Sequence, residues 1–272
     1  MKFLAVLIIV FLYRNWIGGN PLREAFNFGA YANWFQQRVE TPNVRFVLCV
    51  GLPVLVLLLL GMEMRPWLFG LVWLLVSLAV LVYSIDIRDM DLTFDDQSAW
   101  LASLAADTSV DSAAQQQSDF KLTVVYETFQ NLYPALFWFL VLGPAGALIC
   151  ILSRLYMDQL ADESEEMDLV ERVVFWLEWP AAKVTGLLFA LVGHFGRCFD
   201  EWTASLFDAR DTVASGLVRA ACAASTASED SSTDLQQFVA SAQETNLELR
   251  DLLERTLYGW LGIAAIVTIL GL

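Results

Sequence analysis

The sequence is organised around the apolar stretch YPALFWFLVLGPAGALICIL, residues 133–152, which follows a polar segment from Glu127 to Asn131. A transmembrane helix needs about 20 predominantly apolar residues, so this stretch is long enough to cross a bilayer. Gly143 and Ala147 lie four residues apart and share one helix face, where small side chains let a neighbouring backbone come close. The stretch therefore predicts a membrane helix at a packing centre of a helical bundle.

Two prolines mark this stretch. We expect Pro134 in the first helical turn, because a proline there loses no intrahelical hydrogen bond. We expect Pro144 inside the helix, where it removes one backbone hydrogen bond that neighbouring helices must replace. The sequence thus predicts one membrane segment over residues 133–156 with Pro134 at its beginning.

The composition is that of an integral membrane protein. Of the 272 residues, 57% are hydrophobic, and the mean hydropathy is +0.53, which is too apolar for an ordinary soluble domain. Because charged side chains are costly at the middle of a membrane, the net charge of -15 is expected in solvated loops such as the acidic run from Asp162 to Glu166. The expected partner is the lipid bilayer, and acidic loops exclude nonspecific binding of nucleic acid.

The apolar and polar segments alternate in a way that predicts an all-α polytopic membrane protein. We expect a helical bundle of about four to five membrane segments, with amphipathic interfacial helices and helical loops. The predicted regions are an N-terminal anchor and amphipathic segment (1–45), a transmembrane hairpin (46–85), an acidic loop (86–132), a third firm membrane span (133–156), an amphipathic, interfacial and soluble helical region (157–257) and a C-terminal membrane segment (258–272).

Two segments leave alternatives open. Residues 1–17 are short for a full span and fit an anchor or a half-membrane helix. Residues 173–193 contain Glu178 and Lys183, which oppose insertion by roughly 5 to 7 kcal/mol, against roughly 3 to 6 kcal/mol gained from the apolar residues. This segment therefore either lies at the interface or enters the membrane partway. Arginines before the hairpin place the N-terminal region in the cytoplasm.

No metal or cofactor site is predicted. The four cysteines have no CxxC spacing, and His194 is the only histidine, so neither a zinc site nor a disulfide framework is indicated. We expect the cysteines to be packing residues. The sequence also lacks a Ser-His-Asp or Cys-His arrangement, a P-loop and a glycine-rich nucleotide fingerprint, which favours a protein that is not an enzyme.

The segment PALFWFLVLGPAGA, residues 134–147, resembles the AmpE family of bacterial inner-membrane proteins and, more distantly, the CobD/CbiB synthases of cobalamin biosynthesis. A second segment, EWPAAKVT at residues 178–185, is similar to the family element Asp/Asn-Trp-x-Pro-Ala-Arg-Leu-Thr. In this element Lys183 replaces arginine, which keeps the positive charge but loses the bidentate fork. Tyr126 stands where the synthases tend to carry arginine. These departures favour the AmpE branch over the synthase branch.

The resemblance implies a multi-pass protein of the bacterial inner (cytoplasmic) membrane. On the AmpE branch it implies a sensor or accessory protein in cell-wall-recycling signalling and β-lactamase induction, alongside the amidase that cleaves anhydro-muropeptides. The alternative is an amide-forming synthase of the CobD/CbiB type, which joins an aminopropanol phosphate to a cobyric acid side chain. The implied partners are a muropeptide or phosphate-bearing ligand and a cell-wall-recycling protein, and the small-residue face at Gly143 also fits a homo-oligomer.

The candidate ligand-binding residues come from the two family-like segments and from the polar residues 127–131 before the first of them: Glu127, Asn131, Pro134, Trp138, Trp179, Lys183 and Thr185.

Two interpretations of these residues stay open. In the first they line a cleft, where Lys183 binds a phosphate or carboxylate, the tryptophans stack on a flat or sugar ring, and Glu127 accepts hydrogen bonds. Glu127, Asn131 and Trp138 recur at intervals that place them on one helix face. In the second, Glu127 interacts with a helix dipole, the tryptophans are interfacial anchors, and Lys183 extends to the headgroups.

Overall fold

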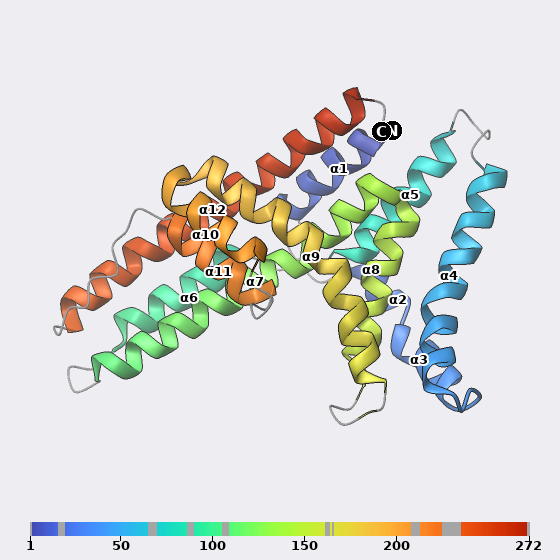
Figure 1. Ribbon diagram of the computed structural model, residues 1–272, viewed down its shortest axis with the longest axis horizontal. Helices are drawn as coiled ribbons and strands as arrows, with labels where there is room; N and C mark the ends of the chain where they lie inside the picture. Colours follow the sequence, from blue (N-terminus) through green and yellow to red (C-terminus); the bar gives the residue numbers. More distant parts are fainter. Residues whose placement is uncertain are drawn as a thin grey trace. The chain divides into compact units, whose positions relative to one another are not determined.

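The secondary-structure elements in the described part of the chain are all α-helices (Figure 1). The computed structural model describes residues 2–15, 20–64, 70–85, 90–104, 109–160, 164, 166–207, 213–224 and 235–270. The predicted all-α fold class is confirmed. The helices are α1 (Lys2–Asn15), α2 (Pro21–Ala25), α3 (Phe28–Gln36), α4 (Pro42–Met64), α5 (Leu71–Ser84), α6 (Met90–Ala102), α7 (Val110–Leu142), α8 (Pro144–Met157), α9 (Met167–Val192), α10 (Phe195–Phe207), α11 (Val213–Ala224) and α12 (Leu235–Ile269).

The chain forms two compact units. The first unit comprises Met1–Ile87, Asn131–Ala181 and Leu261–Leu272, and the second comprises Arg88–Gln130 and Ala182–Trp260. The second unit contains α6, α10 and α11, and α10 packs directly against α11.

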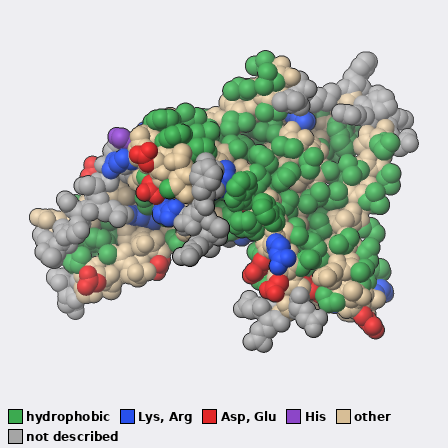
Figure 2. Space-filling model, viewed as in Figure 1, with side chains coloured by type: hydrophobic (Ala, Val, Ile, Leu, Met, Phe, Trp, Pro, Cys, Tyr) green, Lys and Arg blue, Asp and Glu red, His purple; other side chains and the backbone are tan. Residues whose placement is uncertain are grey.

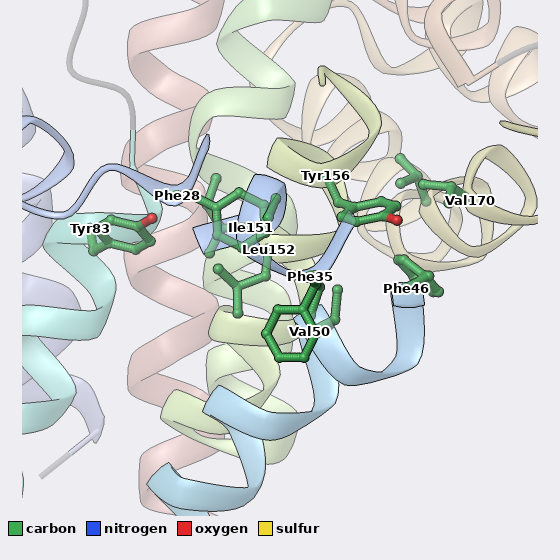
Figure 3. Packing of buried hydrophobic residues seen from close by; sticks show 12 residues of the cluster. Phe28, Phe35, Phe46, Val50, Tyr83, Ile151, Leu152, Tyr156 and Val170 are labelled. Carbon is green, nitrogen blue, oxygen red and sulfur yellow. The ribbon is translucent and has the colours of Figure 1, made fainter. Parts of the chain in front are cut away.

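The core of the first unit surrounds α8. This helix packs against α3, α4 and α5. Figure 3 shows Phe35 from α3, Val50 from α4 and Tyr156 from α8 converging with residues of α9 in one buried cluster. The rings of Phe46 and Tyr156 have their centroids 5.4 Å apart. The C-terminal half of the 133–156 segment is thus the centre of this unit, as its small and apolar residues predict.

Three helices in the described part of the chain are long and apolar enough to cross a membrane: Pro42–Met62, Met167–Val192 and Leu235–Ile269. Shorter apolar helices cover Lys2–Tyr13, Leu71–Ser84, Pro144–Met157 and Val213–Ala224. The space-filling view shows hydrophobic side chains gathered over α4 (Figure 2), where Leu55, Leu58 and Leu59 are exposed. Soluble proteins rarely expose an apolar surface of this extent, so the chain is a membrane protein.

The expectation of one continuous segment over residues 133–156 is wrong. The chain breaks at Gly143, between the end of α7 at Leu142 and the start of α8 at Pro144. Gly143 has φ 73° and ψ -159°, a backbone conformation that is open essentially to glycine alone. The two prolines also exchange their expected roles, since Pro134 lies inside α7 and Pro144 is the first residue of α8. Pro144 therefore loses no intrahelical hydrogen bond.

Other expected boundaries fall inside helices. Residues 167–192 form one continuous helix that is long and apolar enough to span a membrane, and an interfacial position of residues 173–193 stays a prediction. The C-terminal apolar run expected at 258–272 continues a helix that begins at Leu235. The acidic region 86–132 is largely helical, in α6 and α7. The connection between α4 and α5 lies largely outside the described residues.

Replacing Gly143 by alanine should destabilise the protein by about 1–3 kcal/mol, because a Cβ atom forces strain at this positive φ. Gly262 is the matched control, since it lies within α12 and an added Cβ there meets nothing within 4 Å. Thermal unfolding of both purified variants checks the prediction. Equal unfolding temperatures for the Gly143→Ala and Gly262→Ala variants would contradict it.

Candidate functional site

The first motif, which is the family-like segment at residues 134–147, contains a tight connection between α7 and α8. Gly143 supplies the positive φ, and Pro144 begins α8. A Cβ atom added at Gly146 would overlap the carbonyl oxygen of Trp138 and would lie 2.8 Å from the Cβ of Leu142. The first turn of α8 therefore packs directly against the last turns of α7. Of the two glycines in GPAG, Gly143 provides the positive φ and Gly146 allows this close packing.

Trp138 connects the first motif to the residue just before the second motif, which is the EWPAAKVT segment at residues 178–185. Its indole Nε1 donates a hydrogen bond of 2.7 Å to the carbonyl oxygen of Leu177 on α9. Pro180 lies inside α9 and cannot donate a backbone hydrogen bond, so the carbonyl that loses its helical donor is that of Trp176, four residues earlier. The bond from Trp138 to Leu177 is a separate contact with the same turn of α9. The contact places Trp138 against the turn of α9 that precedes Trp179.

A buried ion pair lies beside this contact. Arg154 on α8 places its Nη1 2.9 Å from Oε1 of Glu178 on α9. The side chain of Glu178 is 5% exposed and that of Arg154 is 25% exposed. Arg154 is absent from the predicted site, although a single arginine within the apolar residues 144–157 was a usable signal. An ionisable residue at membrane depth is a functional-site hypothesis by default.

A second charged cluster fixes the beginning of α9. Arg45 on α4 places its Nη1 3.1 Å from Oε1 of Glu166. The hydroxyl of Tyr156 donates a hydrogen bond to Oε2 of the same carboxylate. Glu166 is 4% exposed, so the expectation of a fully solvated acidic run is wrong at this residue. The carboxylate is buried because a cation and a hydroxyl from two other helices meet it there.

In the second unit, a tryptophan on α10 donates a hydrogen bond to the backbone of the second motif. Trp202 Nε1 donates a hydrogen bond of 2.8 Å to the carbonyl oxygen of Lys183. Gly186 makes room for this ring, because an added Cβ would lie 2.7 Å from Cδ1 of Trp202. Thr185 between them is fully buried. The glycine that follows the EWPAAKVT segment is therefore a close-packing residue.

Cys198 lies at the same junction. Its thiol donates to the carbonyl oxygen of Ala220, 3.2 Å away. Burial, with a smaller effect of Glu201, raises the pKa of Cys198 to about 11. A thiol with so high a pKa carries little thiolate at neutral pH and is a poor nucleophile or metal ligand. In the described residues, no group of three or more His, Cys, Asp or Glu side chains could hold a metal ion.

The seven predicted site residues lie on two helices. Glu127, Asn131, Pro134 and Trp138 are on α7, whereas Trp179, Lys183 and Thr185 are on α9.

These residues also fall into two units. The first unit holds Asn131, Pro134, Trp138 and Trp179, and the second holds the other three. Pro134 is buried, whereas Asn131, Trp138 and Trp179 are half-buried. Within the first unit, Trp138 reaches the turn before Trp179, so part of the predicted set is brought together. A shared cleft for all seven stays a prediction.

Comparison with known proteins identifies one family. The model of the family described as "Regulatory signalling modulator protein AmpE" matches residues 31–249. This range includes both motifs and all seven predicted site residues. No curated protein matches the chain, and no solved structure matches it.

Proposed function

The chain belongs to the AmpE family of regulatory signalling modulators, and on this premise we propose that it is a multi-pass regulatory protein of the bacterial inner membrane. We further propose that it modulates cell-wall-recycling signalling and, through it, the induction of β-lactamase. The family match over residues 31–249 is the observation that carries the proposal.

The inner-membrane location is supported by the helices and by the charges beside them. Three helices in the described part of the chain are long and apolar enough to span. Arg23 and Arg38 precede the first of them, and Arg45 lies in its first turn. Arginine and lysine favour the cytoplasmic ends of membrane segments. The same charge bias supports a cytoplasmic position for the N-terminal region of this chain.

The proposed ligand is a muropeptide or another molecule that carries a phosphate or carboxylate. The two units would contribute separate contacts: Trp138 and Trp179 in the first unit would stack on a ring, and Lys183 in the second unit would bind an anionic group. The contact between Trp138 and Leu177 supports this assignment, because it brings one tryptophan to the turn before the other. Glu178 is neutralised by Arg154, so the Glu178 carboxylate does not repel an anionic ligand beside Trp179.

Deletion of the gene in its native host tests the proposal. After challenge with an inducing β-lactam, β-lactamase activity should differ several-fold between the deletion strain and its parent, and the wild-type gene should restore the parental response. The matched control is growth on cobyric acid as the precursor of cobalamin. Unchanged induction together with a loss of cobalamin synthesis would reject the regulatory role and indicate the synthase activity instead.

A further inference from the structure

Two arginines near the membrane helices of the first unit make hydrogen bonds or ion pairs with other parts of that unit. Arg23 donates through Nε to the carbonyl oxygen of Tyr83 at 3.0 Å and through Nη2 to that of Ser84 at 3.3 Å. It therefore satisfies carbonyl groups at the end of α5, which have no partner within the helix. Arg45 donates to the carbonyl oxygen of Val39 at 3.2 Å and pairs with Glu166.

Arg38 differs from both, because its guanidinium lies at the surface. The Cζ atom is 4.1 Å from the centroid of the Trp34 ring, and Nη1 donates to the carbonyl oxygen of Trp34 at 3.4 Å. No carboxylate of the described residues lies within ion-pair distance of Arg38. A guanidinium has five N–H donors, so a cation held in this way keeps hydrogen-bonding capacity for another group.

The surroundings of Arg38 place it next to the membrane. Only a short corner separates the end of α3 at Gln36 from the start of α4 at Pro42. Helix α4 contains the most apolar of the candidate spans. The bond from Arg45 to Val39 folds this corner back on α4. Trp34 is 49% exposed, and Phe26 before α3 is 51% exposed. Arginine and tryptophan beside the end of a span are typical of the headgroup layer.

We propose that Arg38 and Trp34 form a binding site for the phosphate group of an anionic phospholipid, beside the start of α4. A guanidinium binds phosphate oxygens in a bidentate manner, and the indole ring holds its plane in place. The exposed apolar side chains of Trp34 and Phe26 would lie against the acyl chains. The net charge of -15 disfavours diffuse attraction of anionic lipid, so binding has to come from a local cation such as Arg38.

The test is a titration of the purified full-length protein, in uncharged detergent, with phosphatidylglycerol, followed by native mass spectrometry. The Arg38→Gln variant should bind this lipid about fivefold or more weakly, as expected for loss of one cation at an anionic surface. The Arg38→Lys variant should bind with intermediate affinity, because it keeps the charge but loses the fork. Arg255→Gln is the matched control, since Arg255 is 61% exposed and pairs only loosely with Asp251 at 3.6 Å.

Three results would overturn the proposal. One is equal lipid affinity in the Arg38→Gln and Arg255→Gln variants. Another is equal binding of phosphatidylcholine, which has no net charge. The third is complete displacement of phosphatidylglycerol by millimolar inorganic phosphate, which would indicate a site for the free anion. The melting temperatures of the lipid-free variants separate loss of the site from loss of the fold.

Discussion

Replacing Arg154 by methionine should destabilise the folded protein by about 3 kcal/mol or more, because it leaves a buried carboxylate without its cation. The partner is Glu178, whose side chain is 5% exposed and lies 2.9 Å from the guanidinium. Taking a charge out of water is tolerated only when a counter-charge and hydrogen bonds compensate it. The measurement is thermal and denaturant unfolding of the purified variant in detergent.

A double variant separates the ion pair from a general packing defect. Replacing both partners, Arg154→Met with Glu178→Leu, should recover most of the stability that the single Arg154→Met variant loses, since apolar residues of similar volume substitute well for a buried pair. Arg255→Met is the control, because that side chain is 61% exposed. A double variant as unstable as the single one would contradict the assignment of the loss to an unpaired Glu178.

Replacing Gly146 by alanine should destabilise the protein by about 1–3 kcal/mol, the usual range for an extra methyl group in a closely packed interior. The added Cβ would overlap the carbonyl of Trp138, which belongs to a helix backbone and cannot move aside alone. The first turn of α8 would have to shift away from α7, and the contact of Trp138 with Leu177 would shift with it.

Gly51→Ala provides the comparison for Gly146→Ala. Gly51 is also inside a membrane helix, α4, but a Cβ there meets nothing within 4 Å. Alanine at this position should be neutral or stabilise by about 0.5–1 kcal/mol, because it lowers the conformational freedom of the unfolded chain. Equal unfolding curves for the two variants would show that α8 does not rest on α7 at Gly146.

The fold class follows from hydropathy, but the helix break at Gly143 does not. A run of apolar residues has the same hydropathy whether it forms one helix or two helices joined at a glycine. The spacing of Gly143 and Ala147 predicts a packing role for Gly143, whereas the structure uses this glycine for its positive φ, and Gly146 is the packing residue. The prolines are informative only after the break is located, since Pro144 then begins a helix and Pro134 lies within one.

The site residues that sequence analysis missed are those whose role depends on a partner from a distant part of the chain. Glu178 counts against membrane insertion when it is weighed alone, but Arg154 neutralises it in the structure. Glu166 belongs to an acidic run, and only its contacts with Arg45 and Tyr156 distinguish it from solvated carboxylates. Trp138, which the resemblance singles out, makes a helix contact through its indole nitrogen, whereas a ligand-binding role for Trp138 and Trp179 stays a prediction.

The regulatory function that we propose for the second motif is tested most directly by induction of β-lactamase in strains that express Lys183 variants. The Lys183→Ala variant should abolish the contribution of the protein to induction while its membrane level, measured by immunoblot, stays unchanged. The Lys183→Arg variant should retain the response, because it preserves the positive charge. Full induction with the Lys183→Ala variant at normal membrane levels would contradict the claim.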